Sequence, residues 1–322
     1  MFIPIEEAVE VLKRGGIVAL PTETVYGLAA DATNNAAIQK IFAAKNRPSD
    51  NPLICHFNSV EQIEQYVETI PAYALALMHE FCPGPLSFLL PLKKDSPLLA
   101  ATSGQPSVVC RIPQHWLMLA IIKQLNVPLA APSANTSGKV SPTTAQMVED
   151  DLGKKIDGIV DGGACGVGIE STILDCRKQN QITILRPGVI GKPEIEAILK
   201  KNNLQIQIIE SADESEVIPG NKYPHYSPVT LVKKINSISE INSTGNVVLI
   251  SSDEKLNELK NFAGKKISLG SIHDTEHTAQ QLYHNLKSID DLKINQAYYL
   301  ETDWGATSAG KAITNRLKKV TT

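Results

Sequence analysis

The order in which short apolar runs and helical patterns alternate constrains the fold of this chain more than any other feature. Runs rich in β-branched residues are separated by amphipathic patterns through the first two-thirds of the sequence. Such alternation predicts an α/β or α+β domain around one mixed sheet with flanking helices. The runs lie at 17–20, 53–57, 86–90, 107–112, 127–131, 158–161, 171–175 and 182–186, and the helical patterns at 5–14, 34–46, 59–69, 71–81, 114–125, 143–152 and 193–200.

The alternation breaks at about residues 203–228, where the acidic stretch SADESE precedes the turn-rich PGNKYPHYSP. Prolines around Tyr223 and His225 exclude a regular helix or a central strand there. Beyond the break, apolar runs and helical patterns alternate again, which is typical of a small parallel α/β unit. A chain of 322 residues is also longer than one hydrophobic core usually serves. We therefore expect a first domain at 1–203, a linker at 204–228 and a smaller domain at 229–322.

Charge and cysteine content narrow the functional classes. A net charge of −3 provides no global positive field, so direct binding to nucleic acid or to an anionic membrane is expected to be weak or absent. The five cysteines form no CxxC pair, which argues against a zinc knuckle or a disulfide framework and favours a reducing compartment. Neither a signal peptide nor an apolar run of membrane-spanning length is present. We expect a cytoplasmic protein.

Two polar segments follow predicted secondary structure and are candidates for ligand contacts. PTETVYGLAADA (21–32) places Thr24 directly after an apolar run, although capping by Thr22 would explain this segment equally well. KNRPSDNPLICH (45–56) places Lys45 and Arg47 at the end of a helical pattern, where cations are favourable in any case. Its two prolines stiffen the loop around Asn51, so we prefer a preorganised anion site.

Other motifs give weaker signals. Arg111 ends a predicted strand, where its guanidinium could bind a carboxylate or form an ordinary ion pair. APSANTSGKVSPT (131–143) gathers small hydroxyl side chains in one loop before a helix, a setting that suits an anion. DGGACGVGIESTILD (161–175) is not a dinucleotide fingerprint because its glycines precede a strand, but Ser171 remains a possible ligand contact. A lone strand histidine such as His56 is more often a core residue.

Two further patterns are not expected to form a nucleotide site or a metal site. GATSAGKA (305–312) nearly matches a P-loop, yet Ala312 lacks the hydroxyl that would bind Mg²⁺. His273 and His277 are four residues apart without partnering cysteines or an HExxH motif. No set of side chains is predicted to hold a metal ion.

Read in order, PTETVYGL, KNRPSDNPL, RIP, APSANTSG, SPT, GIESTI and ILRPG resemble the YrdC-like family over about residues 4–191. The linker and the ending KAITNRL also resemble the long, two-domain threonylcarbamoyl-AMP synthases of that family. The resemblance implies a twisted mixed YrdC-like sheet and a Rossmann-like C-terminal domain. It also implies a nucleotidyltransferase that converts L-threonine, bicarbonate and ATP with Mg²⁺ to threonylcarbamoyl-AMP and pyrophosphate. A downstream threonylcarbamoyl-transferase complex would then modify tRNA.

The resemblance also assigns residues. It implies that threonine is held by Thr24, His56, Arg111, Ala131 and Ser171. It implies that ATP is held by Lys45, Arg47, Asn51, Ser107, Ser133, Asn135, Ser141 and Arg186, with Lys45 and Arg47 also the catalytic cations. A linker that closes over the nucleotide would add Tyr223 and His225.

The linker departs from the family pattern at Asn221 and Pro224, which stand where the family has methionine and arginine. Loss of the arginine weakens the expected electrostatic share of the linker. Two alternatives stay open on this sequence: a non-catalytic RNA-binding module with a basic ending, KAITNRLKK, and a carbamoyl-adenylate enzyme of the hydrogenase-maturation type. The second would require acylphosphatase and zinc-finger segments that this sequence lacks.

Overall fold

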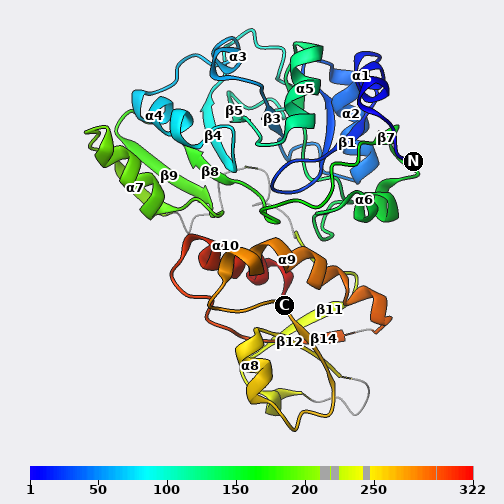
Figure 1. Ribbon diagram of the computed structural model, residues 1–322. Coiled ribbons are helices and arrows are strands. Elements are labelled where there is room, and N and C mark those ends of the chain that lie inside the picture. The colour runs from blue at the N-terminus through cyan, green and yellow to red at the C-terminus, as the bar shows by residue number, and fades with distance from the viewer. Residues whose placement is uncertain (211–217, 219–224, 242–246, 295, 322) are drawn as a thin grey trace.

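A computed structural model describes residues 1–210, 218, 225–241, 247–294 and 296–321. Its strands form two sheets, each with its own helices (Figure 1). The first sheet is mixed, with the strand order β10-β9-β8-β4-β5-β3-β6-β2-β1-β7, and the second is parallel, with the order β11-β14-β12-β13. The predicted combination of a mixed sheet and a smaller parallel α/β unit is confirmed.

The first sheet contains β1 (Val18–Leu20), β2 (Gly27–Asp31), β3 (Ile54–His56), β4 (Leu86–Pro91), β5 (Ser107–Arg111), β6 (Leu129–Ala130), β7 (Gly158–Ile159), β8 (Thr172–Asp175), β9 (Gln181–Arg186) and β10 (Gln207–Glu210). Its helices are α1 (Ile5–Lys13), α2 (Asn35–Lys45), α3 (Val60–Glu64), α4 (Ala72–Phe81), α5 (Trp116–Leu125), α6 (Ala145–Leu152) and α7 (Lys192–Lys201). Side-chain caps begin several of them; Asn34, for example, accepts hydrogen bonds from two N–H groups in the first turn of α2.

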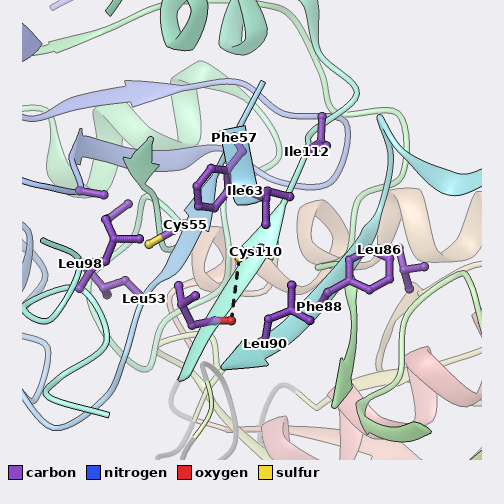
Figure 2. Close-up of a cluster of buried hydrophobic side chains, with 14 of the residues drawn as sticks. Leu53, Cys55, Phe57, Ile63, Leu86, Phe88, Leu90, Leu98, Cys110 and Ile112 are labelled. Atoms are coloured by element: carbon purple, nitrogen blue, oxygen red, sulfur yellow. Dashed lines mark hydrogen bonds between the residues drawn. The ribbon is translucent and has the colours of Figure 1, made fainter. Parts of the chain in front are cut away.

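Alternation along the strands divides the side chains between two faces of this sheet. Cys55, Phe88 and Cys110 of β3, β4 and β5 enter the large core under α2, α4 and α7 (Figure 2). Val18 and Leu20 of β1 face the other way, into a core formed with α1 and α5. On the half of this second face that β3, β4 and β5 form, a small apolar cluster includes linker residue Ile218, which is buried.

The second domain contains β11 (Leu231–Ile235), β12 (Val248–Ser251), β13 (Lys265–Ser268), β14 (Gln296–Leu300), α8 (Asp253–Glu258), α9 (Thr275–Lys287) and α10 (Ser308–Val320). Helices α9 and α10 lie between its sheet and the first domain (Figure 1). One apolar cluster continues across this boundary, because Val25, Val140 and Ile169 of the first domain pack with side chains of α9 and α10. The two domains are therefore joined by a buried interface.

The sequence pattern did not predict two of the strands, β2 and β10. β2 reads GLAAD, which lacks β-branched residues, yet it is buried between β1 and β6. Its pairing partners override its weak propensity. β10 lies inside the segment predicted as linker, where it adds a mostly exposed parallel edge strand to β9. The first sheet therefore extends to Glu210, past the predicted end of the first domain.

Candidate active site

A cavity lies where the β1–β2 turn meets the ends of β3, β5 and β9 and the loop after β6. His56 shares a strand face with Ile54, and Arg111 shares one with Val109, so both point away from the large core. Eight of the predicted residues line the cavity: Thr24, Arg47, His56, Arg111, Ala131, Ser133, Arg186 and His225. Motifs that are far apart in the sequence are thus brought to one place.

The Arg111 guanidinium is held in a fixed orientation in the cavity wall. Its Nη1 donates a hydrogen bond to Thr24 Oγ1 at 2.9 Å, and its Nε donates to the Gly84 carbonyl at 3.3 Å. Its Nη2 lies 2.7 Å from Glu23 Oε1, an ion pair that is almost wholly buried. Glu23 was not among the predicted residues, although it stands inside the quoted PTETVYGL motif. The arginine is preorganised by protein partners on three sides.

His56 lies beside this arginine because β3 and β5 pair in parallel with His56 opposite Arg111. Burial, and then the Arg111 charge, lower the pKa of His56 to about 3. Its imidazole is therefore neutral at physiological pH. Its Nδ1 is buried and has no hydrogen-bond partner among the described residues. A neutral ring with an unused nitrogen in a cavity wall suits a polar ligand better than a satisfied core histidine.

The predicted anion loop begins where α2 ends, at Lys45, because Asn46 adopts a left-handed conformation with φ of 49°. Lys45 Nζ donates to the carbonyl oxygens of Ser133 and Asn135, both at 2.5 Å. Burial, and then the neighbouring Arg47, hold the pKa of Lys45 well below its usual value. The amine therefore ties α2 to the loop after β6. Lys45 does not itself line the cavity, so its part in ATP binding stays a prediction.

Arg47 is held by its own loop. Its Nη2 donates to Asn51 Oδ1 at 2.6 Å and to the Pro52 carbonyl at 2.8 Å, while its Nε donates to the Asn51 carbonyl at 3.0 Å. Asn51 thereby fixes the guanidinium at the cavity wall rather than lining the cavity itself. The loop thus holds the guanidinium in a fixed orientation, and the anion site predicted there stays a prediction.

Arg186 and Ser171 form a second fixed group. Arg186 Nη2 donates to Ser171 Oγ at 3.1 Å, and its Nε donates to the Ser171 carbonyl at 3.0 Å. Ser171 Oγ also lies 2.8 Å from Ser87 Oγ, a buried hydroxyl that the sequence patterns did not indicate. Ser171 thus reaches the cavity through the arginine that it orients.

Glu170 is a further cavity residue that was not predicted. Its Oε1 accepts a hydrogen bond from Ser141 Oγ at 2.6 Å, which places the predicted Ser141 behind it. Its Oε2 accepts from Tyr283 of α9 at 2.7 Å and from Arg316 of α10 at 3.0 Å. Its position in GIESTI, between glycines and a strand, was the only local signal. The cavity wall is therefore tied to the second domain.

Two predicted contact residues, Asn135 and Ser107, do not line the cavity. Asn135 supports Lys45 through its carbonyl and donates from Nδ2 to the carbonyls of Thr136 and Lys139. Ser107 lies at the start of β5 on the same face as Arg111, but it does not line the cavity, so its role stays a prediction. Tyr223 lies outside the described residues.

The GATSAGKA segment and the His273/His277 pair have structural explanations. Thr307 of GATSAGKA caps α10, and Lys311 Nζ lies 2.8 Å from Glu210 Oε1. His273 and His277 are exposed, and the described residues contain no group of three side chains suited to a metal ion. No helix among the described residues is long and apolar enough to cross a membrane.

Fold and cavity together define a two-domain α/β protein whose cavity is lined by fixed arginines and a neutral histidine. Comparison with known proteins gives this class a family. Residues 10–188 match a family model described as "Telomere recombination", and residues 190–321 match one described as "Threonylcarbamoyl-AMP synthase, C-terminal domain". The chain belongs to the Sua5/YciO/YrdC family.

Individual relatives extend this likeness over nearly the whole chain. The threonylcarbamoyl-AMP synthase of Bacillus subtilis is 39% identical over 98% of this chain and 92% of its own length. That of Pyrococcus abyssi is 42% identical over 67% of this chain and 63% of its own length. The crystal structure of P. abyssi Sua5 complexed with L-threonine superposes with a TM-score of 0.84 at 34% identity, covering 98% of this chain and 93% of that one.

Proposed function

We propose that this protein is a threonylcarbamoyl-AMP synthase, which converts L-threonine, bicarbonate and ATP to threonylcarbamoyl-AMP and pyrophosphate. The observation that carries the proposal is one cavity lined by fixed arginines and a neutral histidine. Arg111, held by Thr24, lies beside His56 in its wall, and Arg47 and Arg186 line the same cavity and are held by partners of their own. The names of the relatives support the same activity.

The surroundings of Arg111 suit threonine. Its guanidinium would bind the carboxylate, since a preorganised arginine fork matches carboxylate geometry. Thr24 would keep that fork in position, and the unused Nδ1 of His56 would bond to the substrate hydroxyl or amine. The Ala131 main chain and the Ser171 hydroxyl would complete the threonine subsite.

A second group of residues suits ATP. Arg47 and Arg186 would carry the charge opposite the phosphates, with Asn51 fixing Arg47 and Lys45 acting from behind Ser133 and Asn135. The remaining ATP contacts in this proposal are Ser107, Ser133, Asn135 and Ser141. The partners of Arg47 and Arg186 already orient these cations before ATP binds.

The chemistry needs no covalent intermediate on the protein. The threonine amine attacks the bicarbonate carbon, and loss of water leaves a carbamate. A carbamate oxygen then attacks the α-phosphorus of ATP, and the bond from that phosphorus to the bridging oxygen of pyrophosphate breaks. Each step gathers negative charge, so fixed cations and proximity would supply much of the rate enhancement.

Mg²⁺ is proposed as a companion of ATP rather than a resident ion. The described residues offer no group of three metal-ligating side chains, so the phosphates themselves would hold it. When bound, it would neutralise charge on the departing pyrophosphate. The protein residues would meanwhile orient the two substrates.

The segment before the second domain is proposed to cover the nucleotide. Ile218 packs on Ile54 and Val109, on the strand face that carries His56 and Arg111. His225 and Tyr226 line the cavity from the same segment. A downstream transferase complex that passes the threonylcarbamoyl group to tRNA would complete the pathway.

The basic ending gives little support to an RNA-binding module. Arg316 of KAITNRLKK is fully buried against Glu170, and Lys311 is paired with Glu210. These two cations are therefore occupied within the protein, whereas the cation-rich cavity suits a small anion.

A single assay tests the proposal. The purified chain is incubated with ATP and Mg²⁺, and pyrophosphate is measured with threonine and bicarbonate present, and with each omitted in turn. We expect release that depends on both. Pyrophosphate release that continues without threonine or without bicarbonate would refute the synthase activity.

A further inference from the structure

A buried carboxylate stands in a cavity whose other fully charged lining side chains belong to three arginines. Glu170 is 8% exposed, and it lines the cavity with Arg47, Arg111 and Arg186. Like charges repel strongly where water is excluded. An uncompensated carboxylate at this position would therefore oppose the binding of phosphate.

The compensating charge comes from the second domain. Arg316 of α10 is fully buried, and its Nε donates to Glu170 Oε2 at 3.0 Å. The same guanidinium donates to the main-chain carbonyls of Glu170 at 3.3 Å and Pro187 at 2.8 Å. Arg316 is not itself part of the cavity lining, so it can act on a ligand only through its neighbours.

Groups from several other elements also face Glu170. Ser141 and Tyr283 each donate a hydrogen bond to one of its two oxygens. The Arg186 charge acts on Glu170, and the Glu170 charge acts on Tyr226 and His225. Arg316 additionally lies over the Tyr226 ring, with Cζ 5.4 Å from its centre. One arginine thus contacts both the carboxylate and an aromatic wall of the cavity.

We infer that Arg316 is a positioning residue of the cavity: from the second domain it neutralises and orients Glu170, so that domain docking sets the charge presented to phosphate. The inference rests on the proposed function for the identity of its ligand, the ATP phosphates. Burial by itself raises the pKa of Glu170, but Arg316 and then Arg186 outweigh it and keep that pKa below 4.5. The carboxylate is therefore ionised and compensated at neutral pH.

Binding of inorganic pyrophosphate, measured by calorimetry in EDTA on the full chain, tests this without requiring turnover. Arg316→Met should weaken binding about tenfold or more at neutral pH, because the carboxylate is left with less compensation. Glu170→Gln should bind at least as tightly as wild type, because a negative charge is removed while the shape is kept. Glu170→Gln/Arg316→Met should recover to within about threefold of wild type. Lys311→Met, on the same helix, is the matched control.

The pH dependence separates charge from shape. Without Arg316 the pKa of Glu170 rises, so acidification protonates it and removes the repulsion. The ratio of variant to wild-type dissociation constants for Arg316→Met should therefore fall towards one as pH falls, and should be flat for the double variant. Taking the ratio cancels the titration of pyrophosphate itself.

Several results would overturn the inference: unchanged binding by Arg316→Met, a double variant as weak as that single variant, or weaker binding by Glu170→Gln. If Arg316→Met does not fold, Glu170→Gln and the double variant decide by the same criteria. A wild-type protein that binds pyrophosphate but forms none from ATP would refute the proposed activity and leave this test valid. A wild-type protein that does not bind pyrophosphate would overturn the inference itself.

Discussion

His56 and Arg111 are register partners at the ends of two parallel strands, so an uncharged imidazole and a fixed guanidinium stand side by side in the cavity wall. The strand register therefore fixes the two side chains next to each other. The arginine charge helps to keep the histidine neutral, and the neutral histidine does not compete with the arginine for a carboxylate. This relationship supports placing threonine rather than ATP beside these two residues.

Thr24→Val should impair threonine binding selectively. Valine preserves the shape but removes the hydroxyl that accepts from Arg111 Nη1 at 2.9 Å. Leaving that buried donor short of a partner should raise the KM for threonine about tenfold, with the KM for ATP within about twofold. Steady-state kinetics with each substrate varied separately measures both. An equal rise in the two constants would contradict the assignment.

Arg47→Ala should impair the phosphate chemistry. We expect kcat/KM for ATP to fall about 100-fold or more, because a preorganised charge is lost. Arg177→Ala is the control, since Arg177 forms a partly exposed ion pair with Asp175 and should change activity by less than about twofold. Circular dichroism confirms that both variants fold. Near-normal activity in a folded Arg47→Ala variant would remove this residue from the site.

Acidification should destabilise the protein partly through His56. Its pKa is 6.5 in the unfolded chain and about 3 in the folded protein, so below pH 6.5 the unfolded state binds a proton that the folded state rejects. The free energy of unfolding should therefore fall as pH decreases from 6.5 towards 3. In His56→Gln the fall should be shallower.

Urea denaturation over that pH range measures this effect. His225, whose pKa is also lowered to about 3, should account for part of the remaining slope. His273→Gln, at an exposed position, is the control and should retain the wild-type slope. A His56→Gln protein with an unchanged slope would show that His56 is not buried in neutral form.

Gly168→Ala should disturb the domain interface. Gly168 has a φ of +79°, and an added Cβ would lie 2.3 Å from the Gln280 Cα of α9. Gly163 in the same loop has a φ of +82° with nothing within 4 Å of such a Cβ, so Gly163→Ala isolates the backbone cost. That cost is about 1–2 kcal/mol, and Gly168→Ala should add about 1–3 kcal/mol of overpacking. Equal melting temperatures for the two variants would contradict the close domain contact.

Lys311→Ala should leave ATP use intact. The side chain pairs with Glu210 on the surface, and the preceding Thr307 serves as a helix cap. We expect a KM for ATP within about twofold of wild type, as for other exposed ion pairs. A severe loss of turnover would restore the P-loop interpretation of GATSAGKA.

Local patterns were enough to locate most strands, most helices and some residues that line the candidate cavity. Arg47 could be picked out because a helix end and two prolines lie within a few residues of it. Arg111 was visible because it ends an apolar strand. β2 and β10 could not be located in this way. The burial of β2 and the edge pairing of β10 depend on neighbouring strands rather than on their own residues.

The sequence by itself determined the two-domain α/β class and, through its ordered motifs, the family. Only the tertiary structure decided which polar residues share one cavity and how each is oriented. Glu170 and Arg316 are 146 positions apart, and neither is marked by its local pattern. Their pairing depends on how α10 docks against the first domain. A buried charge is tolerated only with a partner of opposite sign, and the folded interface supplies that partner.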